Sequence, residues 1–517
     1  MSGSTTVVLS SKHTVYATNA NDVTVTAGNG NFHITDHGNA ATITLGNGDQ
    51  VVTASGTDNT ITIGDTTGKH GLSVITTGAD STVTAGDGNV HLTANGNDNT
   101  IQLGNGDDVV KATGTGNQIT IGDTTGNGES QIITGGDSFV SAGDGNVQVT
   151  AGGDQNVIQL GNGQDFVQAT GTGNTINVGT DAGVTNDNTV ITGGGATVTL
   201  GAGNNSVVAS GDGNSIMTLT SDTTGTETII AAGSNNFISI GNTPSSSTGG
   251  SGGGCGGGND DSSGGGGSSQ GGYGDGSGQG GYGQGANCGS GGGSNQGGCG
   301  DGSGQGGYSQ GANCGSGGGS NQGGCGDGSQ GHGGGSLIYT GFHAFVMAGD
   351  GDNTIIAVGG HATIFDGTGD DSIFLLDGPN GGLNAVFLGN GDNYVFLTGS
   401  QNSVFDGSGT DTISAGDGQD VFAMNALGGT DTIFNFNATD QLDLTGILAG
   451  LGLTPDEAGL AGNISVTAQA DNQFGAGGVD TLITVTGSAG TANVALMNYD
   501  AGGLAGLLSQ NSLVLPT

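Results

Sequence analysis

Single aliphatic or aromatic residues recur every nine residues along most of the chain, and Gly, Asn, Asp and Thr fill the positions between them. The pattern lacks the period of about 3.6 residues that a helix requires. The nine-residue series are Ile34, Ile43, Val52 and Ile61; Val74, Val83, Leu92, Ile101, Val110 and Ile119; Val140, Val149, Ile158, Val167 and Ile176; Ile355, Ile364 and Ile373; and Val386, Val395, Val404, Ile413 and Phe422.

A unit of this length fits a turn of about six residues and a strand of about three, with the central strand residue pointing inward and its neighbours outward. Two units make one coil. Because no unit buries enough apolar surface alone, the coils must stack on one another. The pattern therefore predicts an all-β fold with two parallel β-solenoid or β-roll segments of nine-residue repeats, separated by a disordered Gly-rich linker.

A longer repeat is superimposed on the first of these segments, residues 1–241. The string that begins at Ile43 recurs at Ile101 and at Ile158, so the spacings are 58 and 57 residues. A block of 58 residues exceeds six units of nine by four, and the extra residues fall near the DTTG strings. We expect these strings to form loops that protrude from a regular stack.

The nine-residue pattern stops over residues 242–336, which are rich in Gly, Ser and Gln and contain all five cysteines. Such a composition cannot bury a core and predicts a flexible linker. The cysteines are open to two interpretations, cross-links between chains or thiols that are free or paired internally. The pattern returns over 337–424 and ends in a Gly/Ala/Leu/Asn-rich tail, 425–517.

The charge of the chain narrows the choice of partners. Three Lys and no Arg stand against 45 acidic residues, and the formal net charge is −42. This charge repels nucleic acid, whose binding needs basic residues on the phosphates, and it calls for cations to relieve self-repulsion. The sequence has no apolar run long enough to predict a membrane span, and its first residues do not resemble a cleaved signal peptide.

Three units after the linker match the calcium-binding nonapeptide G-G-x-G-x-D-x-U-x, in which U is a large apolar residue. They read DGTGDDSIF from Asp366, DGSGTDTIS from Asp406 and AGDGQDVFA from Ala415. Ca²⁺ takes six to eight hard oxygen ligands, and glycines let the turn aim its carbonyl groups inward. The alternative is that Asp-Gly pairs only form turns. The candidate ligand residues are Asp366, Gly367, Gly369, Asp371, Asp406, Gly407, Gly409, Asp411, Gly416, Gly418 and Asp420, with Asn353 and Asn393 in related units.

The region from Gly349 to Leu444 resembles the RTX (hemolysin-type calcium-binding repeat) family. Its last part, GGTDTIFNFNATDQLDL from Gly428, resembles the segment that closes the calcium roll in type I-secreted proteins. The resemblance implies Ca²⁺ as the cofactor, export by the type I secretion machinery, and an uncleaved secretion signal within 425–517. It also implies a secreted, extracellular or cell-surface location, where calcium would fold the roll after export.

The first segment is a looser relative of this pattern. Asn occupies the sixth position of every second unit, and stacked Asn side chains can hydrogen-bond along a solenoid. Only Asp108 and Asp165 are charged ligands of the expected kind. We expect the segment to stack without metal and to hold a few weak calcium sites. The Asn residues concerned are Asn59, Asn99, Asn117, Asn156 and Asn174.

No motif of a catalytic site stands out. The chain lacks HExxH, and the GGSGG string at Gly249 lies in low-complexity sequence without a strand–turn–helix context. The leading hypothesis is therefore a non-enzymatic, secreted, calcium-binding structural protein, such as an adhesin or a component of a surface matrix. Its partners would be cell-surface or extracellular polysaccharide, or other copies through the linker.

Two further hypotheses remain open. A carbohydrate-active solenoid, such as an epimerase or a lyase, would need basic residues to hold uronates, and the chain has almost none. An ice-binding solenoid would display Thr and Asn from its GTDN and GTGN turns, but these turns recur only at spacings of 58 and 57 residues.

Overall fold

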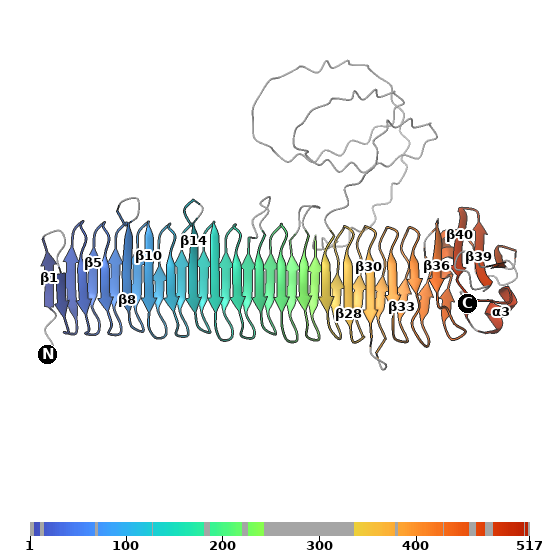
Figure 1. Ribbon diagram of the computed structural model, residues 1–517, viewed down its shortest axis with the longest axis horizontal. Helices are drawn as coiled ribbons and strands as arrows, with labels where there is room; N and C mark the ends of the chain where they lie inside the picture. The colour runs from blue at the N-terminus through green and yellow to red at the C-terminus, as the bar shows by residue number, and fades with distance from the viewer. Residues whose placement is uncertain are drawn as a thin grey trace, which may run out of the picture. The chain divides into compact units, whose positions relative to one another are not determined.

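A computed structural model describes residues 5–10, 15–67, 71–126, 128–179, 187–219, 226–241, 335–377, 381–425, 427, 429–453, 462–470, 479–510 and 512–514. Most of the predicted linker, with its five cysteines, lies outside the described residues. The described part consists of short strands joined by turns, with almost no helix, and the predicted β-solenoid is confirmed (Figure 1).

Each coil contributes one strand to each of two parallel sheets, which we call sheet A and sheet B. Sheet A has 20 strands. They are β1 (Thr5–Leu9), β3 (Val23–Ala27), β5 (Thr42–Leu45), β7 (Thr60–Ile63), β9 (Thr82–Ala85), β11 (Thr100–Gln102), β13 (Gln118–Ile121), β15 (Phe139–Ala142), β17 (Val157–Leu160), β19 (Thr175–Val178), β21 (Thr197–Leu200), β23 (Ser215–Thr218), β25 (Phe237–Ile240), β27 (Phe345–Met347), β29 (Thr363–Phe365), β31 (Ala385–Phe387), β33 (Ser403–Phe405), β35 (Val421–Ala423), β37 (Gln441–Asp443) and β41 (Leu513–Val514).

Sheet B faces sheet A across the core. Its parallel strands are β2 (Val15–Thr18), β4 (His33–Asp36), β6 (Val51–Ala54), β8 (Leu72–Thr77), β10 (Asn89–Ala94), β12 (Val109–Ala112), β14 (Glu129–Thr134), β16 (Asn146–Ala151), β18 (Phe166–Ala169), β20 (Thr189–Thr192), β22 (Ser206–Ala209), β24 (Thr228–Ala231), β26 (Leu337–Thr340), β28 (Thr354–Val358), β30 (Ser372–Leu376), β32 (Tyr394–Leu397), β34 (Thr412–Ser414) and β36 (Thr430–Phe434).

The core consists of the inward residues of each strand. In β5, Ile43 is fully buried while Thr42 and Thr44 are exposed, as a strand alternating between two faces requires. The other residues of the nine-residue series are also buried, with one exception. Val74 is 38% exposed, and its neighbour Ile75 takes the inward place beside Val52. The loop before β8 shifts the phase of the chain by one residue there.

The two predicted segments form one stack, a point that the sequence left open. Strand β24 pairs with β26, and β25 pairs with β27, in the same parallel register as the strands on either side. The chain therefore leaves the solenoid after Ile240 and re-enters it at Leu337 without interrupting either sheet.

The last coil is covered by a different arrangement. Strand β40 (Gly490–Leu496) pairs in parallel with β36, and it continues through antiparallel β39 (Val479–Gly487) to β38 (Ile464–Ala470). The helices α1 (Thr445–Gly450) and α3 (Leu504–Ser509) lie in the same region. No helix among the described residues is long and apolar enough to cross a membrane.

Candidate functional site

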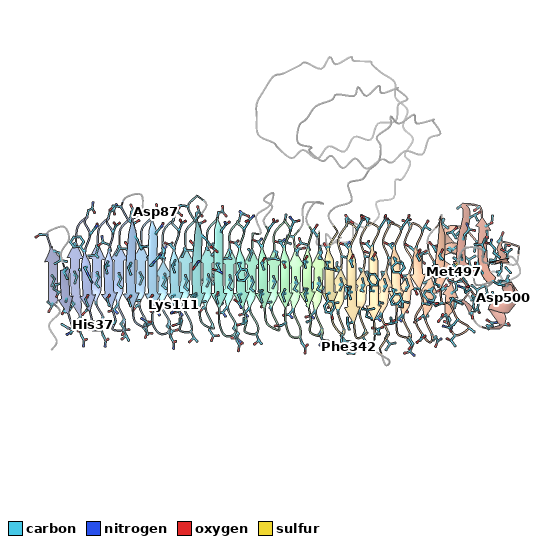
Figure 2. The ribbon with its side chains drawn as sticks, viewed as in Figure 1. His37, Asp87, Lys111, Phe342, Met497 and Asp500 are labelled. Atoms are coloured by element: carbon cyan, nitrogen blue, oxygen red, sulfur yellow. The ribbon has the colours of Figure 1, made fainter. Side chains whose placement is uncertain are left out.

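The turns of the solenoid lie on two edges. We call the turns that lead from sheet A to sheet B the acid edge, and those that lead from sheet B to sheet A the amide edge. Asp87 lies on the acid edge and His37 on the amide edge (Figure 2). The connections after β7, β13, β19, β23 and β25, which are longer than a standard turn, are on the acid edge, and the long connection after β30 is on the amide edge.

Nearly every turn buries one polar side chain at the start of the following strand, and the two edges differ in its chemistry. The acid edge buries Gln50, Asp108, Asp165, Asn188, Asn205, Glu227, Asn353, Asp371, Asn393, Asp411 and Asp431 at these positions, with Ser73, Ser130 and Ser336 in other turns. The amide edge buries Asn59, Asn99, Asn117, Asn156, Asn174, Asn214, Asn236, Asn384, Asn402, Asp420 and Asp440, with Ser81 and Ser138 in other turns.

On the amide edge the side chains satisfy one another. The Asn117 amide oxygen accepts hydrogen bonds from the backbone N–H and from Nδ2 of Asn99, at 3.1 and 3.2 Å. Its Nδ2 donates to the carbonyl groups of Ala112 and Gly114 in its own turn, at 3.2 and 2.8 Å. Asn156 and Asn174 repeat the arrangement. The predicted hydrogen bonding of stacked Asn side chains is confirmed.

In several turns of the acid edge an aspartate occupies the position that asparagine holds elsewhere, and its side chain has no N–H groups to donate. Asn353, on the same edge, shows what those N–H groups do. Asn353 donates from Nδ2 to the carbonyl groups of Gly349 and Gly351, at 2.8 Å each. In the turns that end at Asp371 and Asp411, Oδ1 accepts the N–H of the preceding coil, but the buried Oδ2 receives no N–H donor. A carboxylate oxygen thus stands where the amide turn has a donor.

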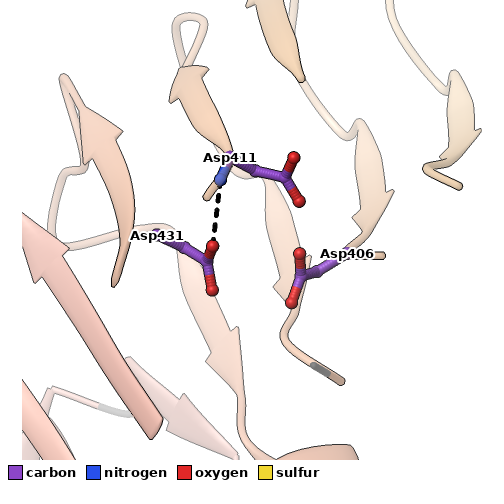
Figure 3. A group of neighbouring side chains, drawn as sticks. All are labelled: Asp406, Asp411 and Asp431. Carbon is purple, nitrogen blue, oxygen red and sulfur yellow. Dashed lines mark hydrogen bonds between the residues drawn. The ribbon is translucent and has the colours of Figure 1, made fainter. Parts of the chain in front are cut away.

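The same two turns begin with a second acid, Asp366 or Asp406. The acid-edge turns just before them begin with Ala348 and Leu388, so the paired acids recur in every second coil. Asp406, Asp411 and Asp431 are all buried, and one carboxylate oxygen of each lies within 4.8 Å of the others (Figure 3).

Glycines allow these turns to stack closely. A Cβ atom at Gly407 or Gly409 would collide with the carbonyl oxygen of Gly389 or Gly391 in the preceding coil. Gly409 also has a φ of +143°, which few other residues adopt without strain. Backbone carbonyl groups are therefore packed against the turn that carries the paired acids.

Burial makes three of these carboxyl groups weaker acids than usual. Burial, followed by the neighbouring Asp371 carboxylate, raises the pKa of Asp366 to about 9. Burial also raises the pKa of Asp371 and brings that of Asp431 to about 6. Like charges at close range in a poorly solvated site cannot all ionise unless a cation compensates them.

Asp108 and Asp165 show the same feature in the first segment. Each accepts an N–H from the preceding coil through Oδ1, and each has a buried Oδ2 without a hydrogen-bond partner. Burial raises the pKa of both to about 7. Leu103 and Leu160 occupy the positions equivalent to Asp366 and Asp406, so no second acid joins them.

The third matched unit lies apart from the other two. Asp420, with Gly416 and Gly418, belongs to the amide edge. Asn402 donates two hydrogen bonds to its Oδ1, at 2.9 and 3.0 Å, and the N–H of Gly416 donates to its Oδ2 at 3.2 Å. Both oxygens of Asp420 already have donors, unlike those of Asp371 and Asp411.

Sequence reasoning did not assign two of the buried acids on the acid edge as site residues. Asp431 follows a turn that is two residues longer than its predecessors, so it falls outside the nine-residue count, although it belongs to the segment that carries the RTX resemblance. Glu227 ends an irregular connection after β23 and accepts hydrogen bonds from the backbone and side chain of Asn205. Only alignment by coil, rather than by motif, would have found either residue.

No family model, curated protein or solved structure matches the chain. A function must therefore be inferred from the geometry of the two edges.

Proposed function

We propose that the protein is a calcium-binding structural solenoid whose acid edge takes up Ca²⁺. The observation that carries the proposal is the pair of buried, unpartnered oxygens on Asp371 and Asp411. Their Asn counterparts, of which Asn353 is the example, close the turn with their own N–H groups. A turn with only acceptors in its interior needs a proton or a cation, and leaving it empty costs about 1–3 kcal/mol for each unsatisfied group.

The oxygen ligands that these turns offer fit calcium better than other metals. Asp406, Asp411 and Asp431 offer carboxylate oxygens, and stacked turns bring backbone carbonyl groups close. Hard oxygen ligands in flexible number suit Ca²⁺, whereas Zn²⁺ and Cu²⁺ favour nitrogen and sulfur. We assign one site to Asp366 and Asp371, and a second to Asp406, Asp411 and Asp431. When bound, the cation would supply charge neutralisation and turn closure, and these residues would hold it.

The proposed role is structural and extracellular, without catalysis. The support is the RTX-like sequence from Gly349 to Leu444, the net charge of −42 and the stacked fold. Calcium is scarce inside cells and abundant outside, so binding would add stability only after export, which we assign to type I secretion. The chain would then act as an adhesive or matrix element that contacts polysaccharide or other copies of itself.

Calorimetric titration of the full chain tests the metal assignment. The chain is freed of metal with a chelator, dialysed, and titrated with CaCl₂ or with MgCl₂. We expect saturable binding of Ca²⁺ and a weaker response to Mg²⁺, with fewer calcium ions bound by Asp411→Asn. The matched control is Asp417→Asn, which removes the same charge from an exposed turn residue. Absence of calcium binding, or an equal loss in both variants, would contradict the proposal.

A further inference from the structure

Sheet A displays two straight rows of threonine on its outer face. The first row aligns Thr24, Thr42, Thr60 and Thr82, and the second aligns Thr26, Thr44, Thr62 and Thr84. We call these eight side chains the threonine array. They come from the consecutive strands β3, β5, β7 and β9, and Thr6 and Thr100 extend the first row at its two ends.

The array faces solvent. Each threonine alternates with a buried residue such as Ile43 or Ile61, and six of the eight are exposed, with Thr24 and Thr84 half-buried. No hydrogen bond within the described residues uses their hydroxyl groups. A β-branched side chain on a strand is restricted at χ1, so the hydroxyl and methyl groups are held in a repeated orientation.

The face is also uncharged, in a protein that carries 45 acids. From β3 to β35, the outward positions of sheet A have no Asp, Glu, Lys or Arg among the described residues, because the acids lie in the turns. The outer face of sheet B includes Lys111 and Glu129. An uncharged array without aromatic rings has nothing to attract ions and no ring face on which a sugar could stack.

The spacing of the array suits a regular lattice. Neighbouring strands lie about 4.7–4.9 Å apart, and residues two positions along a strand lie about 6.6 Å apart. These two repeats, nearly at right angles, are close to the oxygen repeats on a face of hexagonal ice. Figure 1 shows the strands of these coils lying side by side with little fanning, so that the rows stay in step.

The second row of the array ends at β9, because Gln102 of β11 follows Thr84. In the later coils Phe365, Phe387 and Phe405 replace the second row, and they stack with ring centroids 4.5 and 4.4 Å apart and interplanar angles of 5° and 3°. Rings stacked along the solenoid in this way turn their edges outward, so this part of the sheet presents no hydroxyl lattice.

We propose that the threonine array binds ice, with the ordered water of the crystal surface as its ligand. The hydroxyl groups would join the water lattice, and the methyl groups would order the water between the rows. This surface differs from the GTDN and GTGN turns that the sequence suggested. Because the array uses strand residues on sheet A, the inference does not rest on calcium binding at the acid edge.

Ice shaping and thermal hysteresis of the full chain, measured in calcium-containing buffer, test the proposal. We expect faceted ice crystals and a measurable hysteresis gap for the natural chain. The double variant Thr44→Tyr with Thr62→Tyr, which interrupts the second row with bulky rings, should lose both. The matched control carries Thr35→Tyr and Thr53→Tyr, an aligned outward pair on sheet B, and it should keep both.

Two results would overturn the proposal. One is that the natural chain neither shapes ice crystals nor separates the melting and freezing temperatures of ice. The other is that the sheet B control loses ice shaping and hysteresis to the same extent as the sheet A variant. Retention on a crystalline polysaccharide such as chitin or cellulose, abolished by the sheet A variant in the absence of ice activity, would assign the array to a sugar lattice instead. Calcium calorimetry of both variants should match that of the natural chain, which separates a failure of this proposal from a failure of the acid edge.

Discussion

The two edges of the solenoid share one backbone and differ in the side chains that their turns bury: asparagine predominates on the amide edge, whereas the acid edge mixes amides with Asp and Glu. Asn117 on the amide edge donates N–H groups to two carbonyl groups of its own turn. Asp411 on the acid edge has an oxygen in place of that nitrogen, and this oxygen has no partner. The comparison teaches that an Asn turn is complete in itself, whereas an Asp turn whose second oxygen receives no donor, such as that of Asp411, is complete only with a proton or a cation.

The pH dependence of stability in chelator should show the largest effect. Asp108 and Asp165 have pKa values of about 7 in the folded chain, raised by burial from 3.8. The folded chain therefore keeps protons that the unfolded chain releases, and the stability that these two residues contribute falls as the pH rises from about 4 to about 7. Asp366, with a pKa of about 9, extends the fall to about pH 9. The expected loss approaches about 4 kcal/mol per residue, at 1.36 kcal/mol for each pKa unit. Urea unfolding at several pH values measures it.

The double variant Asp108→Asn with Asp165→Asn isolates this contribution. An amide does not titrate, so the slope of stability against pH should be shallower in the variant than in the natural chain. Identical slopes would mean that the buried carboxyl groups of the first segment are ionised throughout, and the contrast between the edges would fail there.

Converting an amide turn into an acid turn should have the next largest effect. In Asn117→Asp the donors to Ala112 and Gly114 are lost, and a carboxylate oxygen faces the freed carbonyl groups. We expect a loss of about 2–4 kcal/mol in chelator at neutral pH, because buried acceptors are left without donors. Denaturation followed by circular dichroism measures the loss.

Asn97→Asp is the matched control. Asn97 is exposed and uses only its oxygen, which accepts the N–H of Thr115, and an aspartate can do the same. A comparable loss in both variants would show that added negative charge, rather than the missing donor, causes the effect.

The reverse exchange should change stability in opposite directions with and without calcium. Asp371→Asn supplies donors to its own turn and removes the negative charge that raises the pKa of Asp366. In chelator we expect a gain of about 1–3 kcal/mol. In excess calcium the natural chain gains binding energy that the variant lacks, about 2.7 kcal/mol at a hundredfold excess over Kd. Thermal melts in both buffers measure the two signs, and a variant less stable in both would contradict the model.

The sequence predicted the fold well because the repeat is local. An inward Ile or Val every nine residues determines both strand and turn, and the predicted core positions are buried except at Val74. The continuity of the two segments could not be predicted, because the pairing of β25 with β27 joins residues about a hundred positions apart. Composition alone cannot decide whether two stacks meet.

The candidate site was predicted in part. The motif identified Asp366, Asp371, Asp406 and Asp411, which the structure places on one edge. The motif describes each nine-residue unit in isolation. It therefore could not show which buried carboxylate oxygens receive hydrogen bonds from neighbouring turns. It gave Asp420 the same standing as Asp411, and it overlooked Asp431, which supplies the third carboxylate.

Asp420 should therefore give the smallest effect among these acids. Donors from Asn402 and Gly416 already satisfy both of its oxygens. In Asp420→Asn the amide can keep its oxygen toward Asn402, but its nitrogen then faces the N–H of Gly416, which costs about 1 kcal/mol for the unpaired donor. The number of calcium ions bound in calorimetry should not change. If it falls by one, as expected for Asp411→Asn, then the amide edge also holds calcium near its C-terminal end, and the presence of an acid, rather than the lack of a donor, decides where the cation binds.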